Sequence, residues 1–181
     1  MSRQKPINCL LFFIFAFLLF QLNAQSDEQI PRYKTGFATV VKIGADIQKV
    51  IDEKYKDVIN EIPVFLETDL MPSIKPVEYT GTNQPMRAVF ISAGFIDLIN
   101  LVSHAKAIDS IQKGYFEKYI LILSKESGKK ELAPLSEGNN EKFNTESIYN
   151  TQRSYFNQMA GMVLGIELSH HYLGHFKKYK D

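Results

Sequence analysis

Hydrophobic residues recur every three or four positions along four stretches of this chain, which is the period of an amphipathic α-helix. The stretches cover about residues 35–62, 95–102, 111–123 and 145–178. The first is long enough for one helix or for two helices separated by a break. In the last stretch, the positions that share one face are Phe156, Met159, Val163, Ile166, His170 and Leu173. We therefore predict that the central part of the last helix is buried against the rest of the domain.

A short β-prone run interrupts this helical pattern. Residues 86–92 contain it, and Gly94 then leads through a turn into the next helix. Proline and glycine punctuate residues 63–85, which we expect to be mainly loop with short extended pieces. The charged residues 124–144 are expected to form an exposed loop. The whole pattern predicts a mainly α domain of the α+β class, with a small strand region near 86–92 and a long C-terminal helix.

The N-terminal residues have the pattern of a secretory signal. Arg3 and Lys5 provide a basic start, an apolar run covers Leu10–Phe20, and Ala24 ends a plausible cleavage site. The run is shorter than the roughly 20 residues that a bilayer-spanning helix needs, so removal is favoured over permanent anchoring. We therefore predict a signal peptide at 1–24 and a single exported domain at 25–181, either periplasmic, envelope-associated or secreted. Membrane contact is expected only through an uncleaved signal segment.

Composition excludes several classes of function. The only cysteine, Cys9, lies in the predicted signal, so the exported domain has no thiol for catalysis, for metal binding or for a disulfide. Without Arg3 and Lys5, two of the 21 basic residues of the chain, the remaining basic residues nearly balance its 20 acidic residues. A balanced charge does not favour nucleic acid or an anionic membrane as a partner.

Three of the four histidines, His170, His171 and His175, lie close together near the C-terminus and follow Glu167. On a continuous helix, Glu167 and His171 are about 40° apart around the axis, with His175 about 40° further on and His170 on the other side of Glu167. One carboxylate and three imidazoles then share one broad sector. Imidazole is a common zinc ligand, and a buried polar cluster is costly unless its groups are paired or bind a metal. The sequence therefore predicts a zinc site on this helix.

The same helix resembles a known motif. The run Ile-Glu-Leu-Ser-His-His-Tyr-Leu-Gly-His at residues 166–175 is similar to the HELAHHxLGH form of the His-Glu-x-x-His zinc metallopeptidases, in particular the HtpX and CAAX prenyl protease type. Residues 87–98 resemble, more weakly, the edge strand and helix that precede the metal helix in that family. The resemblance implies a helical metallopeptidase-like domain acting on a peptide or protein substrate. It makes Glu167 the general base and His170 a zinc ligand.

One position departs from the motif: Ile166 replaces its first histidine. Isoleucine has no lone pair, whereas a catalytic zinc normally has three protein ligands and one open position. Two alternatives would restore a ligand set. His171 and His175 would form a pair four residues apart, with Glu167 as a fourth ligand or as a hydrogen-bond partner of a ligand, or His170 and His171 would act with a ligand from elsewhere. The family also takes a glutamate ligand from a later helix, which we would expect a longer product to supply.

Two functions remain open at this point. The first is an exported zinc-dependent peptidase in which His170 holds zinc together with His171 or His175, and zinc and Glu167 activate water. The alternative is a non-catalytic envelope or secreted helical protein with a degenerate metallopeptidase motif, or an unrelated secreted helical domain. The fourth histidine, His104, is expected to be a packing or helix-surface residue rather than a catalyst.

Overall fold

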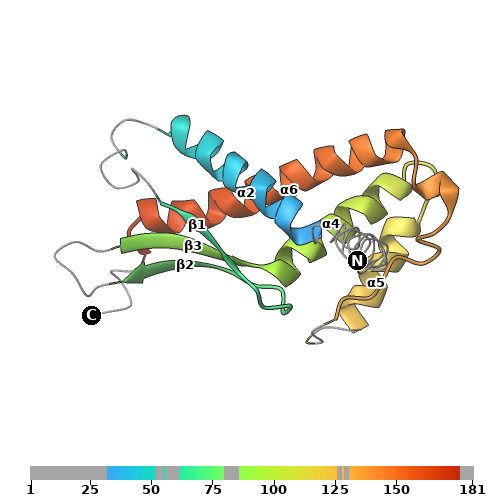
Figure 1. The fold of residues 1–181 in the computed structure, drawn as a ribbon, viewed down its shortest axis with the longest axis horizontal. Coiled ribbons are helices and arrows are strands. Elements are labelled where there is room, and N and C mark those ends of the chain that lie inside the picture. The colour runs from blue at the N-terminus through green and yellow to red at the C-terminus, as the bar shows by residue number, and fades with distance from the viewer. Residues whose placement is uncertain are drawn as a thin grey trace, which may run out of the picture. The chain divides into compact units, whose positions relative to one another are not determined.

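The computed structural model describes residues 32–175, except for 52–54, 56–61, 80–85, 126–127 and 129–130. They belong to one compact unit, Arg32–Asp181. In chain order its elements are α2 (Arg32–Lys49), β1 (Val64–Glu67), β2 (Ile74–Tyr79), β3 (Met86–Ser92), α4 (Ala93–Ile108), α5 (Tyr115–Lys125), the 3₁₀ turn η2 (Glu141–Phe143) and α6 (Glu146–Tyr172) (Figure 1). The mainly helical α+β class predicted from the sequence is confirmed. The predicted signal peptide lies outside the described residues.

Helix α2 ends at Lys49, well before the end of the helical pattern in the sequence. At its last turn, Gln48 Nε2 donates to the carbonyl oxygen of Ile62 at 3.1 Å, and the Ile62 N–H donates to Gln48 Oε1 at 3.2 Å. Ile62 precedes Pro63, whose ring disfavours a helical conformation in the residue before it. The helix predicted over about 35–62 is therefore confirmed as far as Lys49, residues 52–54 and 56–61 lie outside the described residues, and Ile62 itself leads into β1.

The sheet has the strand order β1–β3–β2, so β3 is paired on both sides. It runs parallel to β1 and antiparallel to β2, and Phe90 lies opposite both Phe65 and Lys75. The strand predicted at 86–92 is confirmed with the same bounds. The two outer strands lie in the stretch that was expected to be mainly loop with short extended pieces. Strand β2 contains Pro76, which has no N–H to donate and is therefore suited to an edge strand.

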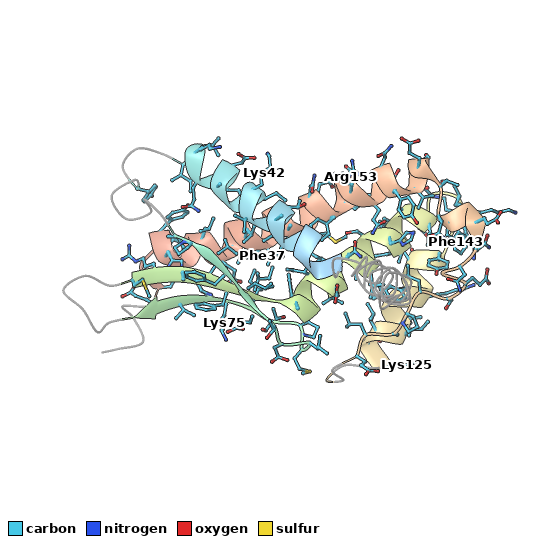
Figure 2. All side chains as sticks on the ribbon, in the orientation of Figure 1. Phe37, Lys42, Lys75, Lys125, Phe143 and Arg153 are labelled. Atoms are coloured by element: carbon cyan, nitrogen blue, oxygen red, sulfur yellow. The ribbon has the colours of Figure 1, made fainter. Side chains whose placement is uncertain are left out.

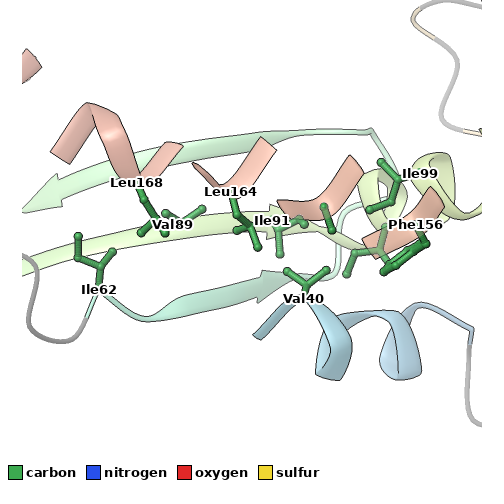
Figure 3. Packing of buried hydrophobic residues seen from close by; sticks show 10 residues of the cluster. Val40, Ile62, Val89, Ile91, Ile99, Phe156, Leu164 and Leu168 are labelled. Atoms are coloured by element: carbon green, nitrogen blue, oxygen red, sulfur yellow. The ribbon is translucent and has the colours of Figure 1, made fainter. Parts of the chain in front are cut away.

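The main core lies between the sheet and the helices α2, α4 and α6. In Figure 3, Leu164 and Leu168 of α6 point toward Val89 and Ile91 of β3. These four side chains are all at most 1% exposed. Burying an aliphatic side chain of this size contributes about 1.5–3 kcal/mol. Helix α6 is therefore held firmly along β3, which fixes the direction of the polar residues at its C-terminal end.

A second apolar cluster packs α5 and the following loop against the end of α4. The Tyr119 hydroxyl donates to the carbonyl oxygen of Ala133 at 2.8 Å, and the ring of Phe143, labelled in Figure 2, is 2% exposed. The prediction of an exposed loop at 124–144 is therefore wrong for Ala133 and Phe143. Their apolar side chains complete the core at this end of the domain. The prediction failed because both residues lie in a stretch of sequence rich in charged residues.

Helix α6 begins where the sequence predicted and ends earlier. Thr145 is its N-cap, and the threonine hydroxyl accepts a hydrogen bond from the Ile148 N–H at 3.3 Å. The helix was expected to continue to Lys178, but its last residue is Tyr172. Gly174 follows with a φ of +62°, a left-handed conformation that ends helices. Among the described residues, no helix combines the length and the apolar character needed to cross a bilayer.

Candidate metal centre

The C-terminal end of α6 turns the chain back on itself. The Leu173 N–H donates to the carbonyl oxygen of Ser169 at 2.9 Å, and the Gly174 N–H donates to the carbonyl oxygen of His171 at 3.4 Å. Glycine adopts the left-handed conformation of position 174 readily because it has no Cβ. The reversal takes His175 off the helical path on which the sequence analysis placed it.

His175 meets His170 as a result of this reversal. Their Nδ1 atoms lie 2.8 Å apart, and the two ring planes make an angle of 63°. Both side chains are partly buried. Residues five apart on a continuous helix differ by about 140° in direction and cannot make this contact. One Nδ1 carries a proton that it donates to the lone pair of the other, so two ring nitrogens converge on a single point.

Glu167 lies one turn before His170 and interacts electrostatically with it. Burial raises the pKa of the Glu167 carboxyl above its ordinary value, and the nearby His170 partly offsets this effect. The carboxyl therefore keeps its proton to a higher pH than an exposed glutamate would. A partly buried acid beside the imidazole of His170 is able to exchange a proton with it or to balance the charge of a bound cation.

His171 lies in the core rather than with the other two imidazoles. Its side chain is 1% exposed, and its Nε2–H donates to the carbonyl oxygen of Ala88 in β3 at 3.1 Å. Burial lowers the pKa of the imidazole, and the hydrogen bond to Ala88 opposes this effect without cancelling it. The side chain holds the end of α6 against the sheet. The structure thus brings together two of the three imidazoles proposed as ligands and directs the third elsewhere.

The described residues do not fit a three-ligand catalytic zinc site. Across the part of the chain that the structure describes, no group of three or more histidine, cysteine, aspartate or glutamate residues is placed to hold one metal ion. His171 points toward Ala88, so neither alternative pair that includes it, with His170 or with His175, converges on a common point. The pair that does converge, His170 with His175, supplies two nitrogen donors.

Two further residues singled out in the sequence have clear positions. Ile166, which replaces the first motif histidine, is 45% exposed and lies one turn before His170. His104 on α4 donates from Nε2 to the carbonyl oxygen of Phe143 at 2.9 Å, and its ring lies beside that of Tyr149. His104 is therefore a packing residue, as predicted.

Sequence reasoning named both His170 and His175 but missed the turn that brings them together. A glycine directly after a helical pattern is a common C-terminal signal, so Gly174 carried information about where α6 ends. That signal would have removed His175 from the helical sector. No comparable signal pointed to the carbonyl oxygen of Ala88, because a backbone acceptor 83 residues away leaves no trace in the sequence.

No family model, curated protein or solved structure matches this chain. The resemblance to the His-Glu-x-x-His metallopeptidases therefore rests on the motif residues 166–175 and on the weaker similarity of residues 87–98. It remains a hypothesis about the origin of the helix.

Proposed function

We propose that this protein is an exported, non-catalytic α+β domain that binds a divalent transition metal ion at the C-terminal end of α6. The observation that carries the proposal is the distance of 2.8 Å between the Nδ1 atoms of His170 and His175. Two imidazole nitrogens that share a proton at this distance could share a cation in its place once that proton is released, because each Nδ1 atom would then offer a lone pair. The basic and apolar pattern of residues 1–24 supports export.

Replacing the shared proton by zinc requires the proton to leave and the two rings to move. With zinc–nitrogen bonds of about 2.0–2.1 Å and tetrahedral angles, two ligating nitrogens lie about 3.3 Å apart. The rings of His170 and His175 would have to separate by about half an ångström from the distance of 2.8 Å and to turn so that both Nδ1 lone pairs point at the ion. His175 lies beyond the last residue of α6, so this movement does not require the helix or its core contacts to shift. Glu167 would help to balance the charge of the cation.

The composition of the pair favours binding without turnover. A catalytic zinc normally has three protein ligands and one open position, and the position of the first motif histidine is occupied by Ile166. His171, a second potential ligand, is engaged with Ala88. A site with two nitrogen ligands can hold a metal ion. It lacks the third protein ligand that normally fixes a catalytic zinc while the zinc activates its bound water.

Metal titration of the purified full chain tests the proposal. Isothermal titration of metal-free protein with Zn²⁺ should detect binding that weakens at least about tenfold in His170→Ala and in His175→Ala, since each variant removes one of two ligands. The matched control is His104→Gln, which changes a histidine that contacts Phe143 and lies on another helix. Absence of zinc binding to the unaltered chain, or equal binding by all four proteins, would refute the proposal.

A second candidate, zinc-dependent peptide hydrolysis, is favoured by one specific observation. Glu167 is partly buried beside His170, and burial raises the pKa of its carboxyl, as suits a general base. If the protein is a peptidase, its hydrolysis of an unstructured protein substrate should stop on addition of chelator and in Glu167→Gln. Zinc-dependent hydrolysis that persists in Glu167→Gln would remove this residue from the role of base.

A further inference from the structure

We infer that the metal centre is completed by a second copy of this chain, so that one zinc ion joins two protomers through His170 and His175 of each. The inference rests on the proposed metal binding and deepens it by naming the partner. Structural zinc sites in proteins are almost always four-coordinate. The converging pair supplies two nitrogens, and the described residues bring no third histidine, cysteine or carboxylate ligand to them. Two identical pairs related by a two-fold axis supply four.

An exposed apolar surface lies along the C-terminal half of α6 and its C-cap, on the side of the helix that carries His170. Met162, Ile166 and Leu173 are 70%, 45% and 59% exposed. Their spacing of four and seven residues places them within about 40° of one another around the axis of α6, and His170 is about 40° from Ile166. Ser169 lies on the same stripe, and its hydroxyl already donates to the carbonyl oxygen of Ile166 at 2.7 Å. The stripe therefore presents apolar groups and a satisfied hydroxyl to a partner.

The charge of this part of α6 favours a second copy as that partner. Between residues 154 and 173 the sequence contains no aspartate, glutamate, lysine or arginine other than Glu167. Two copies can therefore approach along the stripe without repulsion between like charges at the contact. Glu167 supports the same arrangement, because its carboxylates from the two protomers together balance the two positive charges of one zinc ion. A two-fold dimer is also the commonest form of self-association among soluble proteins.

Zinc-dependent association of the purified full chain is the direct test. Sedimentation velocity should show monomer after treatment with chelator and dimer after addition of Zn²⁺, and isothermal titration should give one zinc ion per two chains. His175→Ala should remain monomeric at zinc concentrations that saturate the unaltered protein. Because His175 lies beyond the end of α6 and outside the core, circular dichroism should show that this variant is folded.

Two isoleucine variants separate the contribution of the apolar surface to dimerisation from the contribution of the zinc ligands. Ile166→Ser keeps both imidazoles but removes an exposed apolar group beside them, and should weaken zinc-dependent dimerisation at least about tenfold. Ile111→Ser makes the same change at an isoleucine that is 58% exposed between α4 and α5, and should leave dimerisation unchanged. Equal effects of the two substitutions would argue against the stripe as the contact.

The outcomes distinguish this inference from the function on which it rests. One zinc ion bound per monomer would keep the proposed metal binding and overturn the dimer. A dimer that forms without zinc, or that survives His175→Ala, would also overturn it. Failure of the chain to bind zinc at all would overturn both the function and the inference.

Discussion

His171 of α6 is joined to Ala88 of β3 by a hydrogen bond of 3.1 Å from the imidazole Nε2 to the carbonyl oxygen, across 83 residues of sequence. Because a carbonyl oxygen only accepts, Nε2 carries the proton in the folded protein. The side chain is 1% exposed, so this link is made in the interior. The histidine nearest the middle of the cluster is therefore structural, and it sets the position from which the chain turns toward His175.

The burial of His171 predicts a loss of stability in mild acid. Burial lowers the pKa of this imidazole below the value of 6.5 expected in the unfolded chain. The unfolded state therefore binds more protons than the folded state in this range, and stability rises with pH. We expect the free energy of unfolding to fall as the pH drops below about 6.5, by at most about 1.4 kcal/mol per pH unit from this group.

Urea unfolding between pH 7.5 and 5.5 measures this effect. His171→Gln removes the titrating group, so its stability should depend less on pH across this interval. Glu167, whose raised pKa favours the folded state at low pH, acts in the opposite direction and mainly nearer pH 4.5, its ordinary value. An identical pH dependence in His171→Gln and the unaltered chain would exclude His171 as the source.

Gly174→Ala should disturb the histidine pair through backbone strain alone. A Cβ at position 174 would meet no atom within 4 Å, but the φ of +62° is unfavourable for alanine. We expect a loss of about 1 kcal/mol in stability, together with weaker zinc binding because His175 is displaced from His170. Chemical unfolding and zinc titration measure the two effects.

The matched control is the same substitution at Gly165 in the middle of α6. A Cβ there also meets no atom within 4 Å, but the residue is helical and its φ is not positive. Gly165→Ala should therefore stabilise the protein by about 0.4–1 kcal/mol, opposite in sign to Gly174→Ala. A similar loss in both variants would mean that the turn at Gly174 has no special role.

Ser92 connects β3, α4 and the loop before β2, and its removal should be costly. Its fully buried hydroxyl accepts from the N–H groups of Phe95 and Ser73, at 3.0 and 2.8 Å, and donates to the carbonyl oxygen of Met71 at 2.8 Å. Ser92→Ala leaves three partly buried backbone groups without this partner, so we expect a loss of about 2–4 kcal/mol in thermal or chemical unfolding.

The control for Ser92 is an exposed serine with a single local bond. Ser110 donates its hydroxyl to the carbonyl oxygen of Ala107 at the end of α4 and is exposed. Ser110→Ala should change the free energy of unfolding by no more than about 0.5 kcal/mol. A loss at Ser92 of similar size would show that its hydrogen bonds contribute little.

Restoring the first motif histidine tests the resemblance to the metallopeptidases. Ile166→His places an imidazole one turn before His170, at an exposed position that can accept it without disturbing the core. If the helix retains the geometry of the motif, zinc affinity should rise about tenfold or more, and chelator-sensitive proteolysis should appear or increase. Competition with a zinc indicator and a peptide-cleavage assay measure these outcomes. No change in either would count against the alignment with the motif.

Local patterns predicted the elements that depend on neighbouring residues. The strand at 86–92 is visible in a run of β-prone residues, and the start of α6 in the N-cap Thr145. The two partners of that strand were less visible, because β1 has four residues and β2 contains Pro76. Their stability comes from pairing with a strand elsewhere in the chain, which a local pattern does not record.

The sequence by itself determined that one carboxylate and three imidazoles gather at the end of a long amphipathic helix. Only the tertiary structure decided how they divide, with His171 directed to Ala88 and His170 paired with His175. Helical periodicity fixes the direction of a side chain only while the helix continues, and Gly174 ends that continuity. A buried imidazole, for its part, takes whichever acceptor the packing of distant elements places beside it.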